Sequence, residues 1–256
     1  MSTTDWRQVD RAELLELSGG DPFLRWVTDD RLLAIAGPAG WAWLHPWRPG
    51  GRHWGGAFIG PDHDGGALAG SALSRLILLA QADGVAPEWF STTDGGALRL
   101  PAGWEQAGVG EWDFMWTEEA REPTPTGLDF IELDDTADAA ELERFGRAHN
   151  AAFEGFPGWD YALLWLGVRR RGELVAIGAL HALGAGTPHL AGIVTHTDCR
   201  GQGLGEAMVT ELTRRAIAVA GVSTLGVTHT NTAALRLYQR LGYRTAHLFR
   251  TVDLSR

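Results

Sequence analysis

The second half of the chain alternates short apolar runs with segments of helical periodicity. The apolar runs, which are typical of buried strands, are Gly167–Arg169, Glu173–His181, Leu190–Thr195 and Ser223–Thr228. Apolar residues at helical spacing predict α-helices over Leu142–Phe153, Tyr161–Leu166, Glu206–Ala220 and Asn231–Leu241. A closing hairpin is predicted from Tyr243 to Leu254. Helices that alternate with strands in this way predict an α/β fold around a mixed β-sheet.

The first half of the chain repeats this order of elements. Its predicted helices are Arg11–Leu17, Pro22–Val27 and Ala69–Ala82, and its predicted strands are Leu32–Ala36, Trp41–Leu44, Trp54–Ile59 and Glu88–Thr92. Between the halves, the charged and then Pro/Thr-rich segment Glu118–Gly127 is typical of a linker. We therefore predict two tandem copies of one fold, in residues 1–120 and 129–256, joined by a linker at 121–128.

A glycine-rich turn, Arg200–Gly205, lies between a predicted strand and a predicted helix. Backbone N–H groups point outward at such a helix start, and the helix dipole adds partial positive charge, so the turn suits a phosphate. A dinucleotide-binding turn would need a third glycine at Met208, and the chain has no Gly-Lys-Ser/Thr phosphate loop. An ordinary surface turn is the alternative that this pattern leaves open.

A second motif, Asn231–Tyr243, follows the next predicted strand. Asn231 is a good helix N-cap, and Gly242 is a natural residue just past a helix end. Tyr238 recurs at helical spacing with apolar residues, so taken alone it would be a core tyrosine of an amphipathic helix.

Together the two motifs resemble the signatures of the GNAT N-acetyltransferase superfamily. The first matches Arg/Gln-x-x-Gly-x-Gly/Ala, and the second matches a short helix with Asn and Tyr that is closed by Gly-Tyr. The resemblance covers roughly Leu142–Thr251, whereas the first half resembles the family only in the order of its elements. It implies a tandem acyl-CoA N-acyltransferase fold, acetyl-CoA as co-substrate and direct attack of an amine on the thioester, an acyltransferase of class EC 2.3.1.

The resemblance also implies roles for individual residues. Tyr238 would be the general acid for the CoA thiolate, and Asn231 would contact the pantetheine arm or a bridging water. Backbone groups of Ile193, Val194 and Thr195 would hold the pantetheine arm. The pyrophosphate would be bound by Arg200, Gly201, Gln202, Gly203, Leu204, Gly205 and Glu206.

The sequence leaves the general base open, because the strand Leu190–Thr195 contains no acidic residue. His196 and Glu154 are our candidates; Glu154 lies in a loop that usually lines the acceptor pocket in this family. Two further histidines, His181 and His229, lie at or beyond strand ends, and an imidazole of ordinary pKa suits a base at neutral pH. A chain of water molecules without a dedicated base is the remaining alternative.

The first half lacks the residues that would bind acyl-CoA. Its glycine turn, Asp62–Ala69, has no arginine, and its two aspartates would repel a pyrophosphate. No tyrosine lies between Thr92 and Gly103, although Gly103–Trp104 stands where Gly242–Tyr243 stands in the second half. We therefore predict a degenerate first copy.

Composition narrows the partners. The net charge of −10 argues against a general nucleic-acid binder and suits a cationic amine acceptor. A single cysteine excludes a disulfide framework and a cysteine zinc site, and we expect no metal. The apolar runs are too short to span a bilayer and no signal peptide is visible, so we expect a cytoplasmic protein without a membrane partner. The twelve tryptophans either pack the core or form an aromatic wall for the acceptor.

The sequence therefore predicts an N-acetyltransferase that moves an acetyl group from acetyl-CoA to a primary amine of a small molecule. Within the same scaffold, the donor could instead be another acyl-CoA, or the acceptor a peptide or protein amine. A non-catalytic acyl-CoA sensor is the alternative from a different class. The sequence identifies neither the acceptor nor whether the protein is a monomer or a homodimer.

Overall fold

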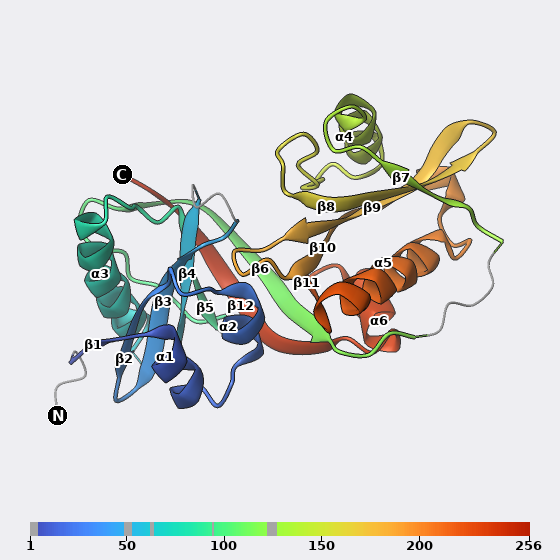
Figure 1. The fold of residues 1–256 in the computed structure, drawn as a ribbon. Coiled ribbons are helices and arrows are strands. Elements are labelled where there is room, and N and C mark those ends of the chain that lie inside the picture. Colours follow the sequence, from blue (N-terminus) through green and yellow to red (C-terminus); the bar gives the residue numbers. More distant parts are fainter. Residues whose placement is uncertain (1–4, 49–52, 62–63, 94, 122–126) are drawn as a thin grey trace. The chain divides into compact units, whose positions relative to one another are not determined.

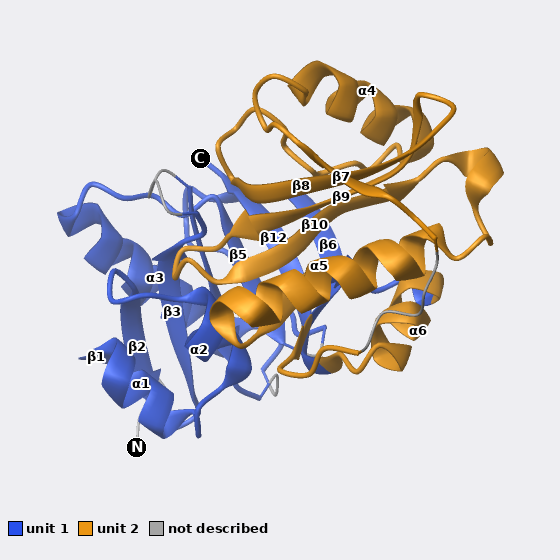
Figure 2. Ribbon diagram, turned by 45° about the vertical axis from the view of Figure 1, so that its right-hand side comes forward, with its two compact units in different colours: residues 1–114, 227–232, 245–256 blue, residues 115–226, 233–244 orange. Residues whose placement is uncertain are grey.

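The computed structural model describes residues 5–48, 53–61, 64–93, 95–121 and 127–256 (Figure 1). They form two compact units (Figure 2), and neither unit is a single stretch of chain. Unit 1 comprises Met1–Phe114, Val227–Thr232 and Thr245–Arg256, and unit 2 comprises Met115–Gly226 and Ala233–Arg244. Residues 122–126 of the expected linker lie outside the described residues, so the boundary at 121–128 stays a prediction.

Unit 1 is a mixed sheet with three helices. Its elements are β1 (Arg7–Val9), α1 (Arg11–Leu17), α2 (Pro22–Val27), β2 (Leu33–Gly37), β3 (Gly40–Pro46), β4 (Trp54–Ile59), α3 (Ala67–Ala82), β5 (Trp89–Thr93), most of β6 (Glu105–Thr117) and most of β12 (Arg244–Ser255). The strand order is β1-β2-β3-β4-β5-β12-β6. Strands β1 to β4 pair antiparallel, β4 and β5 pair parallel, and β5 pairs antiparallel with β12.

Unit 2 has the same plan. Its elements are β7 (Phe130–Leu133), α4 (Ala139–His149), β8 (Ala162–Arg170), β9 (Glu173–Ala182), β10 (Pro188–Thr195), a 3₁₀ helix (Thr197–Cys199), α5 (Leu204–Ala220), most of β11 (Ser223–Thr228) and most of α6 (Thr232–Arg240). Strands β7 to β10 pair antiparallel in sequence order, and β10 pairs parallel with β11. In both units, four strands therefore pair antiparallel in sequence order. The fourth of them also pairs parallel with a fifth strand, and a long helix forms the crossover between those two strands.

Each unit has its own apolar core. In unit 1, Leu73 and Leu76 of α3 are fully buried against strand residues such as Ile35, Leu44 and Phe90. Each such side chain stabilises the fold by roughly 1.5–3 kcal/mol.

In unit 2, Leu142 and Phe145 of α4 pack on Trp165, Ile177 and Val194 of the sheet. Figure 1 shows α4 and α5 on opposite faces of this sheet. The helix that starts at the glycine turn and the helix that leads into the Glu154 loop are therefore both fixed by the sheet.

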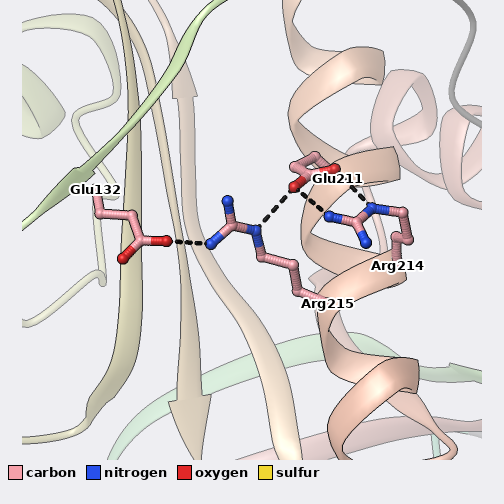
Figure 3. Close-up of polar contacts among 4 residues, drawn as sticks. All are labelled: Glu132, Glu211, Arg214 and Arg215. Carbon is pink, nitrogen blue, oxygen red and sulfur yellow. Dashed lines mark hydrogen bonds and ion pairs between the residues drawn. The ribbon is translucent and has the colours of Figure 1, made fainter.

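Ion pairs hold α5 in its place on the unit 2 sheet (Figure 3). Glu211 bonds Arg214 at 2.7 Å and Arg215 at 2.8 Å, and Arg215 reaches on to Glu132 of β7. The arginines lower the pKa of the Glu211 carboxyl, and these carboxylates raise the pKa of Arg215. Through the Arg215–Glu132 pair, the network links α5 to β7 of the sheet.

Most predicted elements are confirmed, but the predicted helix Tyr161–Leu166 is not formed. Tyr161 precedes β8, and Ala162–Leu166 belong to β8, which pairs with β7 and β9. A short run rich in Leu and Ala suits a buried helix and a buried strand equally well. Pairing partners on both sides, which no local pattern reveals, decided the outcome.

The predicted closing hairpin from Tyr243 to Leu254 is also wrong. Arg244–Ser255 is the single strand β12, and Phe249 pairs with Thr93 of β5. The segment contains no glycine, proline or asparagine that would reverse the chain. The missing turn residues were the signal for an unbroken strand.

Within the residues that the structure describes, no helix has both the length and the apolar character needed to cross a membrane.

Candidate functional site

A bulge interrupts β10 of unit 2. Ala191 pairs with Ala179 and Val194 pairs with Ile177, so Gly192 and Ile193 together stand opposite Gly178. Gly192 has φ +59°, and a Cβ there would lie 2.9 Å from the Trp165 ring and 3.1 Å from the Gly155 Cα. Only glycine allows this approach, and the bulge turns backbone groups of Gly192 and Ile193 out of the regular ladder. A glycine inside a predicted strand was the sequence signal for it.

The glycine turn that follows is open. Gly201 and Gly203 adopt φ +74° and +80°, and a Cβ at either residue would meet no atom within 4 Å. The Ala207 N–H makes a helical bond to the Gly203 carbonyl at 3.0 Å, so the N–H groups of residues 204–206 precede the first intrahelical bond. Exposed donors at a helix N-terminus, with free space before them, suit a phosphate.

Arg200 lies at the edge of this turn. One of its guanidinium nitrogens donates to the His149 carbonyl at the end of α4, at 2.5 Å. This bond ties the turn to α4 and also satisfies one of the carbonyls left unpaired at a helix C-terminus. The arginine is exposed and carries further donors for an anion.

Two more arginines surround the turn. Arg170 donates to the Gln202 side chain at 2.6 Å, and that side chain donates to the Asp198 carbonyl at 3.3 Å. Arg240 of α6 pairs with Glu206 at 3.3 Å. Gln202 is therefore part of the frame of the turn, and three cations lie close to where a pyrophosphate would be bound.

His149 and His196 stack beside the turn with ring centroids 4.0 Å apart. The Thr197 N–H donates to Nδ1 of His149 at 3.4 Å, and the Asp198 N–H donates to Nδ1 of His196 at 3.2 Å. Burial lowers the pKa of His149, and His196 and Arg200 lower it further. Because its Nδ1 accepts a bond, neutral His196 carries its proton on Nε2, which leaves no lone pair for a substrate in this conformation.

Tyr238, the predicted general acid, is 8% exposed on α6. Burial raises its pKa to about 12. Its ring packs edge-on against Tyr243 at 5.8 Å, and the Tyr243 N–H donates to the Tyr238 carbonyl at 3.0 Å. The Tyr243 hydroxyl is tied to Thr213 at 2.6 Å and Ser223 at 2.7 Å. Tyr243 is therefore a structural tyrosine that positions the end of α6.

The remaining candidates lie in different surroundings. Glu154 is exposed, and the next residue along the chain is the Gly155 that touches the β10 bulge. His181 is buried in β9, with the Tyr161 and Trp165 rings 6.3 Å and 6.1 Å away.

Two of the predicted residues belong to unit 1. Asn231 precedes α6, and its N–H donates to the Thr228 carbonyl at 2.8 Å. His229 bonds Asp113 through Nδ1 at 2.8 Å.

The corresponding turn of unit 1 is filled by the chain itself. A Cβ on Gly66, at φ +83°, would lie 2.6 Å from the Ala97 carbonyl carbon. Arg99 donates to the Gly65 carbonyl at 3.0 Å and to the Asp64 carbonyl at 3.1 Å. The Asp64 carboxylate accepts a hydrogen bond from the Ala67 N–H of α3 at 3.0 Å. A carboxylate of the chain itself therefore lies at the helix start, where a bound anion would otherwise be. Asp62, the other predicted acid, lies outside the described residues.

Across the described part of the chain, no three or more His, Cys, Asp or Glu side chains are grouped so that they could hold a metal ion.

Comparison with known proteins agrees with this geometry. Residues 127–243 match the sequence pattern of the acetyltransferase (GNAT) family. No curated protein matches the chain significantly.

Solved structures share the fold over nearly the whole chain. A Drosophila protein has a TM-score of 0.58 and 14% identity, with 98% of each chain covered. A GNAT-family acetyltransferase from Novosphingobium aromaticivorans has a TM-score of 0.55 and 19% identity, with 90% of this chain and 91% of that chain covered. A GCN5-related N-acetyltransferase from Sphaerobacter thermophilus has a TM-score of 0.53 and 16% identity, with 100% of this chain and 96% of that chain covered. The chain therefore shares the fold of these structures, and its residues 127–243 match the acetyltransferase (GNAT) family.

Proposed function

We propose that this protein is an N-acetyltransferase that moves the acetyl group of acetyl-CoA to a primary amine of a small molecule by direct attack. The observation that carries the proposal is the open glycine turn at the start of α5, which follows a bulged β10. Both features lie inside the region that matches the family.

The residues of unit 2 fit acetyl-CoA, which supplies the activated thioester. The N–H groups of residues 201–206 and the Arg200 side chain would bind the pyrophosphate. Backbone groups of Ile193–Thr195 would hold the pantetheine arm as an added strand. An amide of the β10 bulge would polarise the thioester carbonyl, because a preorganised donor stabilises the negative charge that develops there.

Tyr238 would donate to the sulfur of the leaving group. A pKa of about 12 keeps its hydroxyl protonated throughout the working range of pH. The same pKa makes Tyr238 a weak acid towards a thiolate, whose reference pKa is about 8.5. We therefore expect a hydrogen bond to the sulfur first and proton transfer only as negative charge builds up.

For the proton of the amine, we propose Glu154 ahead of His196. Glu154 is an exposed carboxylate next to the glycine that touches the bulge, whereas the His196 lone pair accepts the Asp198 N–H. Asn231 belongs to unit 1, so we do not assign it to this unit 2 site. We also propose that unit 1 binds no acyl-CoA, because Asp64 and residues 97–99 fill its turn.

The test is release of CoA thiol from acetyl-CoA with a panel of primary amines, beside calorimetric titration with CoA. We expect Tyr238→Phe to lower kcat about 100-fold or more and to leave the CoA affinity within about twofold. Tyr243→Phe is the matched control, because it removes the hydroxyl of the neighbouring tyrosine. It should lower the stability of the protein but not the turnover. If acetyl-CoA fails to bind, the proposal is wrong. Binding without transfer to any amine would favour the sensor alternative.

A further inference from the structure

The loop after α4 carries three aromatic side chains that pack on one another: Phe156, Trp159 and Tyr161, here called the aromatic cluster. Their ring centroids are 5.6 Å, 6.1 Å and 5.9 Å apart. Trp159 is nevertheless 56% exposed, which is high for a tryptophan. The cluster therefore presents an aromatic face to the surroundings.

The loop is held in a strained shape. Phe156 and Asp160 adopt φ +48° and +61°, a left-handed conformation that is rare for residues other than glycine. Asp135 holds the loop with both carboxylate oxygens, accepting the Asp160 N–H at 3.1 Å and the Trp165 indole N–H at 2.8 Å. A strained backbone of this kind persists only where surrounding bonds hold it in place. Here the bonds of Asp135 hold the loop, and Trp159 lies between the two strained residues.

The aromatic cluster is continuous with the candidate acetyl-CoA site. From Tyr161, ring contacts lead to His181 at 6.3 Å and on to Trp165 at 6.1 Å. Trp165 in turn adjoins Gly192 of the β10 bulge, as does Gly155, which precedes the first ring of the cluster. Packing contacts through the buried rings of His181 and Trp165 thus link the exposed Trp159 to the bulge.

The charge around the aromatic cluster is negative. Glu154 and Asp160 are both exposed and flank it in sequence. No lysine or arginine occurs between Arg147 and Arg169. An aromatic face with carboxylates beside it suits a ligand that combines a flat ring with a protonated amine.

We propose that the aromatic cluster is the acceptor-binding surface, and that the acceptor is a small arylalkyl amine, a primary amine joined to an aromatic ring by a short chain. This inference rests on the proposed function. The ring would stack on Trp159, and the ammonium group would lie towards Glu154. The ammonium first gives up one proton to solvent; the neutral nitrogen then bonds to the acetyl carbon as the carbon–sulfur bond breaks. The nitrogen passes its second proton to Glu154, and the sulfur takes one from Tyr238.

The test compares two amines on the full chain saturated with CoA. 2-Phenylethylamine carries the ring, and propylamine does not. We expect Trp159→Ala to weaken binding of 2-phenylethylamine about tenfold, the order of magnitude for a lost aromatic contact. Trp159→Phe should restore part of this affinity. Propylamine binding and acetyl-CoA affinity should be unchanged. Val219→Ala is the control for loss of an exposed apolar side chain in the same unit, since Val219 is 80% exposed on α5.

The outcomes separate this inference from the proposed function. Equal binding of 2-phenylethylamine to the wild type and to Trp159→Ala would overturn the inference, while acetyl-CoA binding and transfer to other amines would leave the proposed function intact. If acetyl-CoA does not bind, the proposed function fails, and the amine titration is repeated without CoA. A tenfold loss there would still support an aromatic amine site at Trp159, and equal affinities would exclude one. Should Trp159→Ala not fold, Trp159→Phe against the wild type decides by the same comparison.

Discussion

The two units contain the same turn in opposite states. In each, a glycine in the left-handed conformation, Gly66 at φ +83° or Gly203 at φ +80°, precedes a long helix and has no side chain to cap it. In unit 2, a Cβ placed on Gly203 would meet no described atom within 4 Å. In unit 1, Ala97 occupies the corresponding space, Arg99 bonds the turn, and Asp64 bonds the first helical N–H. The turn of unit 2 is therefore open, and the turn of unit 1 is closed by residues of the chain itself.

The difference arises further along the chain. After β11, unit 2 forms the helix α6, which carries Tyr238. After β5, residues 96–100 of unit 1 form neither helix nor strand, and they lie on the glycine turn. The segment that would be the Tyr238 helix in one copy is thus the segment that fills the turn in the other. The comparison teaches that the two units differ in one segment after the strand, which is a helix in unit 2 and covers the glycine turn in unit 1.

The largest effect should come from closing the open turn. Gly201→Asp places a carboxylate where unit 1 has Asp64, two residues before the glycine that precedes the helix, and like charge should lower the acetyl-CoA affinity at least 100-fold by calorimetry. The matched control is Gly186→Asp, because Gly186 also has φ +78° and no atom within 4 Å of a Cβ. Gly186→Asp should lower the free energy of unfolding by a similar amount and leave the acetyl-CoA affinity unchanged. Equal affinities for both variants would show that the turn does not hold the pyrophosphate.

The next effect concerns the Gly-Tyr end of α6, which unit 1 replaces by Gly103–Trp104. Tyr243→Phe removes a hydroxyl that bonds both Thr213 and Ser223, and it leaves two buried hydroxyls to find other partners. We expect a loss of about 2 kcal/mol in the free energy of unfolding, measured by urea titration. A loss below about 0.5 kcal/mol would mean that the two hydroxyls simply bond each other.

A smaller effect is expected from loosening the filled turn. Arg99→Ala removes two bonds to the carbonyls of Asp64 and Gly65, and because Arg99 is exposed we expect a loss of about 1 kcal/mol or less in urea unfolding. Acetyl-CoA should still bind once per chain, since Asp64 remains at the helix start. A second bound acetyl-CoA would show that residues 97–99 alone keep unit 1 from binding.

The smallest expected effect is a pH dependence of folding stability that arises from His149, which lies at the end of α4 beside the open turn. His149 has a lowered pKa when folded, so below its ordinary value of about 6.5 the unfolded chain binds more protons than the folded chain. Stability should therefore fall as the pH drops from 7 to 5, by less than about 1 kcal/mol given the partial exposure. His149→Gln should flatten that slope in urea unfolding at several pH values. A slope that the variant leaves unaltered would assign the response to other groups.

Local chemistry explains what could be predicted from the sequence. Gly203 and Gly242 mark backbone reversals that only glycine adopts readily, and periodicity identifies α5 and α6 to within two residues at each end. The strands Trp54–Ile59 and Ser223–Thr228 have the predicted bounds. These features depend on a few neighbouring residues, so the amino-acid sequence by itself determined the order of elements, the family signature and the position of the turn.

Features that join distant parts of the chain were decided by the tertiary structure alone. Pairing with β5 made Arg244–Ser255 one strand, and pairing with β7 and β9 made Ala162–Leu166 part of another. The bond from Arg200 to His149 and the series of rings from Trp159 to Gly192 join residues far apart in sequence. Such contacts depend on which surfaces meet when the chain packs, and local propensity carries no information about them. The residue pattern alone placed a glycine turn before a long helix in each unit, and packing decided which of the two turns stays open.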